Sequence, residues 1–375
     1  MALSKVDLAN QVENQLPQNL VANNLPFRNI IINGDMSIAQ RVTSVSSYTS
    51  DAYSTVDRMK TRVGSLGTWT ISQDTDVPSG QGFAKSLKWD CTTADASPSA
   101  NDYLILEQNI EGQNLQYLKF GTANAVSLTA SFWVKSNKIG NYTVGLQCAG
   151  NNRHIESSYT INVSNTWEKK TITFAGDTTG VLANDNSEEM KLWFWLGGGS
   201  NFSSGTQDTS WSSYVGANVL VSGQVNLADS TSNYINITGV QLEAGTTASD
   251  FEFLPHDVNL QRCYRYCYRI NGNATDEQLT STGGFIFSTS ISSINYTFHP
   301  PLRAVPTVSE SNSLEQVTNA AMSLSSLFDD NQVGDCNSVG VVFGADSGAP
   351  FTTNTFSNMR LQNTTAAFIE FDAEL

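Results

Sequence analysis

The sequence predicts a mainly β protein, in which a jelly-roll β-sandwich is followed by a short helix and a second, smaller β-sandwich domain. Short runs that alternate apolar and polar residues recur along most of the chain and are bounded by Gly, Asn, Ser and Asp, as is typical of strands and their turns. Only one stretch has the apolar spacing of a helix. No unit of about 20 to 50 residues repeats, which argues against a propeller or a β-helical spike.

Length and composition limit the classes of protein. A chain of 375 residues suggests two domains, and 39% hydrophobic residues are enough for sizeable cores. Only 15% of the residues are charged, the net charge is -15, and no cluster of Lys and Arg is interleaved with aromatic residues. Nucleic acid is therefore not an expected partner. The acidic surface favours solubility and is also compatible with neutral sugars or divalent cations.

The five cysteines, at positions 91, 148, 263, 267 and 336, are an odd number without a paired framework. We expect small buried side chains rather than disulfides. The first residues lack a basic region followed by an apolar run, and no stretch approaches the length of a membrane span. We therefore expect synthesis in a cytoplasm, release by lysis and no membrane insertion.

Residues 1–26 predict an N-terminal attachment arm. Leu and Val recur there among Gln and Asn, and Pro17 and Pro26 interrupt any helix. One or two capped turns near Ser4 would be marginal alone. We expect the arm to order on a partner protein, and a frayed terminus is the alternative.

Residues 27–258 are expected to form the jelly-roll domain. The clearest strands are predicted over 126–134, 142–148, 170–174 and 192–196. Many short strands joined by loops of turn-forming residues indicate a sandwich or a jelly roll.

Residues 259–272 predict a connecting helix, best defined over 259–270, with Asp257 as its N-cap. One face carries Leu260, Cys263, Tyr264 and Cys267, and the other carries Arg262, Arg265 and Arg269. The Arg stripe is a candidate interface for an acidic partner, and a solvated face is the alternative. Because no His or further Cys lies at ligand spacing, zinc at the two cysteines is not expected.

Residues 273–375 predict the second domain, a β-sandwich tip. Its strands are expected over 285–291, 295–298, 305–309, 339–343 and 366–371.

Strand alternation places three indoles on outward faces. Leu192, Phe194 and Leu196 share one face, which leaves Trp193 and Trp195 on the other, and the same pattern in 126–134 leaves Trp133 outside. Indoles stack on the CH-rich faces of sugars, so the three are candidates for a glycan platform. The alternative is that the loop 197–216 or a neighbouring subunit covers them. Trp211 and Tyr214 lie on that loop and are the better exposed glycan-binding candidates.

Several motifs follow one another in a recognisable order. They are Asn33-Gly-Asp35, Asp57-Arg58, Ser131-Phe-Trp-Val-Lys-Ser136, Thr166-Trp-Glu-Lys-Lys170, Phe194-Trp-Leu-Gly-Gly-Gly199 and Gln241-Leu-Glu-Ala-Gly245. Over residues 28–270 this order resembles the jelly-roll module of tailed-bacteriophage fibre and appendage proteins and, more distantly, jelly-roll carbohydrate-binding modules. Met59 stands where Trp is usual. The C-terminal domain, with Phe298-His-Pro-Pro-Leu-Arg303, is similar to phage fibre ends.

The resemblance implies a phage structural protein, a tail fibre or receptor-binding appendage, in the virion and assembled in the host cytoplasm. It implies a homotrimer that recognises bacterial surface polysaccharide and contacts other virion proteins through the arm. It also raises Asp35 and Glu243 as oxygen ligands of a structural calcium. The alternatives for these two residues are a turn at Asp35 and an ion pair between Glu243 and an Arg.

The chain is not expected to be an enzyme. It contains no Ser-His-Asp order, nucleophile elbow, Walker loop or zinc-protease helix. Two other functions stay open. One is a purely architectural virion component, such as a head fibre, decoration or tail adaptor, and the other is a tailspike that depolymerises polysaccharide.

Overall fold

The computed structural model describes residues 27–272, 297–309 and 368–375 in full, and the backbone of six strands between residues 284 and 361. The predicted arm and Cys336 lie outside the described residues. The chain divides into two compact units, which are described separately. Unit 1 contains Thr43–Leu254 together with Met1–Ser37, and unit 2 contains Ile38–Val42 and Pro255–Leu375.

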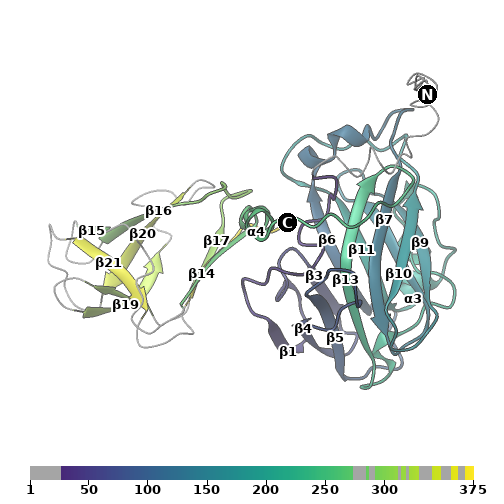
Figure 1. The fold of residues 1–375 in the computed structure, drawn as a ribbon, viewed down its shortest axis with the longest axis horizontal. Coiled ribbons are helices and arrows are strands. Elements are labelled where there is room, and N and C mark those ends of the chain that lie inside the picture. The colour runs from purple at the N-terminus through teal and green to yellow at the C-terminus, as the bar shows by residue number, and fades with distance from the viewer. Residues whose placement is uncertain are drawn as a thin grey trace, which may run out of the picture. The chain divides into compact units, whose positions relative to one another are not determined.

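Unit 1 is a sandwich of two antiparallel sheets (Figure 1). Sheet A has the order β1 (Ser44–Tyr48), β4 (Thr68–Asp74), β5 (Ser86–Thr93), β13 (Tyr234–Ala244), β7 (Leu128–Ser136) and β10 (Glu168–Phe174). Sheet B has the order β12 (Ser212–Ser213), β9 (Arg153–Ile161), β8 (Gly140–Cys148), β11 (Glu188–Gly198), β6 (Tyr103–Glu111), β3 (Lys60–Gly64) and β2 (Asp51–Tyr53). The chain crosses repeatedly between the sheets, for example from β5 to β6, β7 and β8, in the manner of a jelly roll. The mainly β fold class is confirmed, and each of the four strands predicted most clearly overlaps an observed one.

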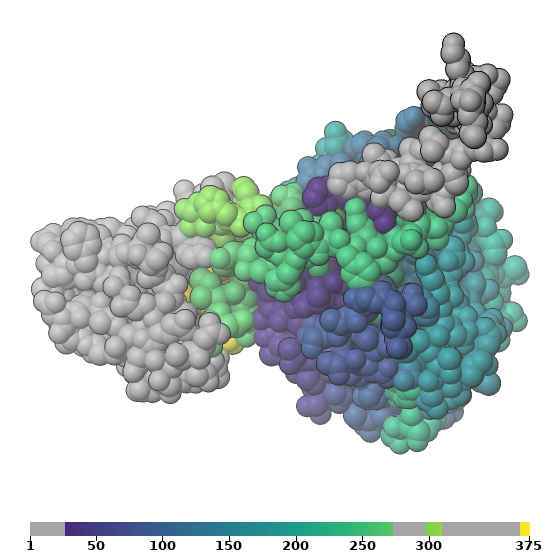
Figure 2. All heavy atoms as spheres, in the orientation of Figure 1, coloured from purple at the N-terminus to yellow at the C-terminus, as the bar shows by residue number. Residues whose placement is uncertain are grey.

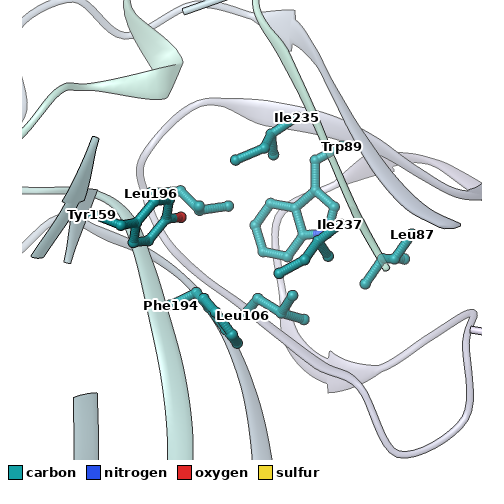
Figure 3. A pocket seen from close by; sticks show the side chains of 8 residues that line it. All are labelled: Leu87, Trp89, Leu106, Tyr159, Phe194, Leu196, Ile235 and Ile237. Carbon is teal, nitrogen blue, oxygen red and sulfur yellow. The ribbon is translucent and has the colours of Figure 1, made fainter. Parts of the chain in front are cut away.

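The core of unit 1 lies between the sheets and follows from strand alternation. Leu192, Phe194 and Leu196 of β11 are buried there, and Phe132 and Val134 of β7 meet them from the opposite sheet. The apolar gap in this core holds only about 10 Å³ and is surrounded by side chains such as those in Figure 3. A space of that size is too small for a sugar, so any ligand site must lie outside the core.

A bulge in β13 shapes the outer face of sheet A. The pairing of β13 with β7 shifts register between Thr238 and Gln241, and Gly239 within the shift has a φ of +61°. Before the bulge β13 pairs with β5. After the bulge, β13 bonds instead to the first described residues of unit 1. Val240 N–H donates to Gly34 O at 2.9 Å, and Ile30 N–H donates to Leu242 O at 2.9 Å.

Unit 2 contains α4 (His256–Tyr264) and a three-stranded sheet of β14 (Cys267–Asn271), β22 (Phe368–Asp372) and β17 (Thr307–Glu310). The backbone of six further strands closes a barrel in the order β15, β16, β20, β19, β18, β21. Their bounds are Gly284–Ile286 for β15, Ser292–Thr297 for β16, Leu314–Val317 for β18, Ala321–Phe328 for β19, Gly340–Ser347 for β20 and Phe356–Leu361 for β21.

The segment Ile38–Val42 belongs to unit 2, although the rest of that unit begins only at Pro255. Gln40 Nε2 donates to Cys267 O at 2.8 Å. The buried Arg41 guanidinium pairs with three carboxylates, at 3.3 Å to Glu370, 3.0 Å to Asp372 and 3.6 Å to Glu374. The segment is therefore tied to β14 and to the last residues of the chain.

The predicted connecting helix is shorter than expected. It ends at Tyr264, its N-cap is Pro255 rather than Asp257, and residues Cys267–Asn271 form β14 instead of further helical turns. These residues pair with β22 over their whole length, from Cys267 opposite Asp372 to Asn271 opposite Phe368. Pairing with a distant strand thus overrides the helical spacing.

The remaining helices in the described part of the chain are single turns. They are η1 (Gly112–Asn114), η2 (Gln116–Leu118), α3 (Ser200–Ser203), η3 (Gly216–Asn218) and η4 (Leu227–Asp229). Among the described residues, no helix is long and apolar enough to cross a membrane. The four described cysteines are buried, as predicted.

Candidate functional site

A hollow of about 290 Å³ lies on the outer face of sheet A, entirely within unit 1. Its floor is formed by Ser131 and Trp133 of β7 and by Lys169 of β10. The loop between β4 and β5 and the chain that follows β13 also line it. We call this hollow the outer groove.

Trp133 offers the outer groove an indole whose N–H bonds to none of the described residues. Of the seven indoles, all within the described residues, four donate their N–H to the protein, namely those of Trp69, Trp167, Trp193 and Trp211. Those of Trp89 and Trp195 are fully buried. Trp133 is partly exposed, and no described residue accepts its N–H. A ligand in the groove can therefore both stack on this ring and accept a hydrogen bond from it.

Lys169 and Asp250 supply opposite charges to the groove. Lys169 lies directly opposite Trp133 in the β7–β10 pairing. Both side chains are exposed, and neither forms an ion pair with a described residue. Together with the Ser131 hydroxyl they provide donors and acceptors at the edge of a ring that lies on Trp133.

Three phenylalanines form an apolar wall of the groove. Phe83, Phe251 and Phe253 pack with ring centroids 5.0, 5.0 and 4.9 Å apart. The bulge of β13 makes room for Phe83, since a Cβ at Gly239 would lie 2.6 Å from its ring. Phe253 remains 49% exposed. We call these three residues the phenylalanine wall.

The Gln241-Leu-Glu243 motif holds the wall in place. The Glu243 carboxylate accepts the Ser249 N–H at 2.8 Å and the Ser249 hydroxyl at 2.6 Å. Gln241 Oε1 accepts the Glu252 N–H at 2.8 Å, and Glu252 in turn accepts the Asn29 N–H at 2.9 Å. Figure 2 shows the chain after β13, in green, lying on the surface beside the purple start of unit 1. The motif therefore positions Asp250, Phe251 and Phe253.

No protein-family model and no curated protein matches the chain. Among solved structures, the enzymatically active domain of tailspike protein 4 of bacteriophage CBA120 is similar with a TM-score of 0.31 and 14% identity. The match covers 59% of this chain and only 22% of that one. A family 11 carbohydrate-binding module from Clostridium thermocellum, solved with a β-1,3-1,4-mixed-linked tetrasaccharide, is similar with a TM-score of 0.28 and 9% identity, over 55% of this chain and 96% of the module.

Trp193 and Trp195 do not form a glycan platform, which corrects their candidacy. They are 2% and 1% exposed, because the loop after β11 covers them with Phe202, Val219 and Leu220. The predicted alternative of a covering loop therefore describes these two rings. Only Trp133 of the three outward indoles lines the outer groove.

A buried polar cluster lies beneath the same loop. His154 contacts Glu156 at 3.0 Å through Nδ1 and Asp208 at 3.0 Å through Nε2, and Trp193 Nε1 donates to Glu156 at 3.1 Å. Burial raises the pKa of Glu156 to about 7, although its bonds to His154 and Trp193 act in the opposite direction. Burial lowers the pKa of His154, but its bonds to the two carboxylates outweigh burial and raise it overall. His154 and Glu156 are fully buried, so the cluster holds the loop against β9 and β11.

Trp211 and Tyr214 face inward, contrary to the expectation of exposed rings. Trp211 Nε1 donates to Ala175 O at 2.6 Å, and its ring packs on Phe120 at 5.5 Å. The Tyr214 ring packs edge-on against His154 at 5.1 Å. Both side chains hold the loop on the sandwich, and neither lines the outer groove.

Glu243 does not fit the calcium site predicted for it and Asp35. Hydrogen-bond donors surround the Glu243 carboxylate, with Ser249 as above, Gln241 Nε2 at 2.8 Å, and the Arg28 guanidinium at 3.9 Å. Such donors take the positions that a cation would need. Within the described part of the chain, no group of three or more His, Cys, Asp or Glu side chains is arranged to hold a metal.

The predicted Arg stripe is not continuous. Arg262 lies on α4, Arg265 follows the helix, and Arg269 lies on β14. Arg269 Nη1 pairs with Glu370 at 2.7 Å, and the guanidinium lies 3.6 Å from the Phe368 ring centroid. Because the helix ends before Arg269, the three side chains do not share one helical face, and Arg269 contributes to the sheet of unit 2.

Sequence patterns indicate only part of the groove. They point to Trp133, but not to Lys169, Asp250 or the phenylalanine wall. The alternation Phe251-Glu-Phe253 just after a strand was a usable signal, since two apolar rings at that spacing point to the same side of an extended chain.

Proposed function

We propose that unit 1 binds a bacterial surface glycan in the outer groove, without covalent chemistry. The observation that carries this is Trp133, a partly exposed indole on the floor of a groove that also offers Lys169 and Asp250, and no described residue accepts its N–H. A sugar ring would lie with its CH face on the indole and its hydroxyls toward the charged groups. The groove volume of about 290 Å³ suits one or two sugar units.

The biological setting that we propose is a tailed-bacteriophage fibre or receptor-binding appendage in the virion. The order of motifs over residues 28–270 supports it, as set out above. The arm, residues 1–26, would attach the chain to other virion proteins, and assembly would take place in the host cytoplasm. A homotrimer would multiply a weak sugar affinity into firm attachment, because linked sites bind at high effective concentration.

A glycan array and a whole-cell binding assay with the full chain test the groove. Trp133→Ala should weaken binding by about 30-fold, as is typical when a central aromatic contact is removed. Tyr117→Ala is the matched control, since Tyr117 is an aromatic residue, 51% exposed and outside the groove. Equal binding by Trp133→Ala and the unmodified chain would exclude the groove, and no binding by the unmodified chain would favour an architectural role.

We further propose that the protein does not cleave its glycan. A reducing-sugar assay on bound capsule or lipopolysaccharide should show no new chain ends over the buffer control. Released ends would identify a depolymerising tailspike and would overturn this part of the proposal.

A further inference from the structure

The outer groove has more apolar surface than a plain hexose requires. Beyond the Trp133 floor, the phenylalanine wall stands at the side of the groove, and Phe253 is 49% exposed although it belongs to a packed group of three rings. Exposed apolar surface inside a groove favours an apolar group of a ligand.

A free amide lies next to this wall. Gln81 lines the groove, its side chain is exposed, and no described residue bonds to its side-chain amide. It is adjacent to Gly82, where a Cβ would lie 3.2 Å from the Phe253 ring. One ligand substituent could therefore meet an amide and an apolar ring at the same time.

We infer that the ligand of the outer groove carries an acetamido group, as in an N-acetylhexosamine; this inference rests on the proposed glycan binding. The acetyl methyl lies against the phenylalanine wall, and the amide of the substituent bonds to Gln81. The sugar ring occupies Trp133, with its hydroxyls toward Lys169 and Asp250.

The charges of the groove agree with a neutral acetamido sugar. Lys169 and Asp250 carry opposite charges, so the groove offers no concentration of positive charge for a polyanion. The whole chain has a net charge of -15, which repels acidic polysaccharides at long range.

Two matched pairs of probes test the inference by calorimetry or NMR titration of the full chain. The first pair is the β-1,4-linked tetramers of N-acetylglucosamine and of glucose, and the second is the methyl glycosides of N-acetylgalactosamine and of galactose. In at least one pair the acetamido sugar should bind about tenfold more tightly, from burial of one methyl and one added hydrogen bond. A third pair, L-rhamnose and L-mannose, separates an acetamido preference from a general preference for methyl groups.

Variants then locate the preference. Phe253→Ala and Gln81→Ala should each reduce the affinity ratio within the preferred pair severalfold. Val163→Ala, which removes an apolar side chain that is 55% exposed outside the groove, should leave the ratio unchanged.

The outcomes separate this inference from the proposed function. Binding that depends on Trp133 but shows no acetamido preference overturns the inference and leaves glycan binding standing. A preference confined to L-rhamnose, or one that Phe253→Ala does not alter, also overturns it. No binding to any probe or array glycan overturns both.

Discussion

Glu156 and His154 titrate beneath the loop that covers β11, and both have raised pKa values in the folded state. The pKa of Glu156 is about 7 when folded, against about 4.3 in an unfolded chain. Between these values the folded state binds more protons, so stability falls as pH rises. The contribution of His154 is complete below about pH 6.5 and is lost as pH rises through its raised pKa. We expect the urea midpoint of unit 1, followed by tryptophan fluorescence, to be lower at pH 8 than at pH 5.

Glu156→Gln is the control for this pH dependence. The amide cannot titrate but can still accept the Trp193 N–H. The variant should show a smaller difference between pH 5 and pH 8, with the remainder coming from His154. Carboxyls with lowered pKa, such as Glu168 at about 2, contribute equally at both pH values. An unchanged pH dependence in Glu156→Gln, or greater wild-type stability at pH 8, would contradict the role of the cluster.

At the residue scale, alternation predicted the face of each indole but not what covers it. The rule placed Trp133, Trp193 and Trp195 outside, and all three indeed lie outside the core between the sheets. Their exposure differs because the loop after β11 covers two of them on sheet B, while Trp133 lies on sheet A. The course of that loop depends on contacts such as Asp208 with His154, which are 54 positions apart and leave no periodic signal.

The bulge of β13 is the element that shapes the groove, and it depends on Gly239. At a φ of +61° an Ala is strained, and its Cβ would lie 2.6 Å from Phe83. We expect Gly239→Ala to lower the free energy of unfolding by about 2 kcal/mol and to weaken glycan binding, because Phe83 must move. Urea unfolding and the glycan array measure the two effects.

Gly223→Ala is the matched control for Gly239→Ala. Gly223 has a similar φ of +76°, but nothing lies within 4 Å of an added Cβ. It should lower the free energy of unfolding by about 1 kcal/mol and leave binding intact. Equal loss of binding in both variants would show that the bulge does not shape the groove.

Also at the scale of elements, the helical spacing of the sequence wrongly predicted that the helix continues after α4. Cys263 and Cys267 are both buried and four residues apart, as in one face of a helix. The strand β14 forms because β22, about a hundred residues later, and β17 complete a sheet there. The predicted strands of unit 1 agree better with the structure because alternation within each strand already encodes two faces.

At the scale of the whole molecule, the two units are not contiguous in sequence. The sequence predicted contiguous domains, whereas Ile38–Val42 belongs to the later unit. The hydrogen bond from Arg41 to Glu370 spans 329 positions, and nothing in the local sequence around Arg41 indicates its partner. Arg side chains are rarely buried unless they are paired, so the burial of Arg41 is not expected from its residue type.

Arg41 should therefore stabilise unit 2 specifically. Arg41→Leu removes the buried guanidinium that Glu370, Asp372 and Glu374 share, while Glu370 keeps its pair with Arg269. Removing one partner of a buried ion pair typically costs about 3 to 5 kcal/mol. All seven tryptophans lie in unit 1, so fluorescence follows that unit alone. Hydrogen exchange of the β14 and β22 amides should accelerate in Arg41→Leu, while the fluorescence midpoint stays unchanged.

Arg62→Leu provides the reciprocal control within unit 1. Arg62 pairs with Asp51 at 3.2 Å and with the buried Glu107 at 3.3 Å. Its loss should lower the fluorescence midpoint and leave exchange in β14 and β22 as it is. If Arg41→Leu instead lowered the fluorescence midpoint while exchange in β14 and β22 did not change, Arg41 would not stabilise unit 2. Faster exchange in β14 and β22 for Arg41→Leu alone, with a lower fluorescence midpoint for Arg62→Leu alone, would show that the segment Ile38–Val42 stabilises unit 2.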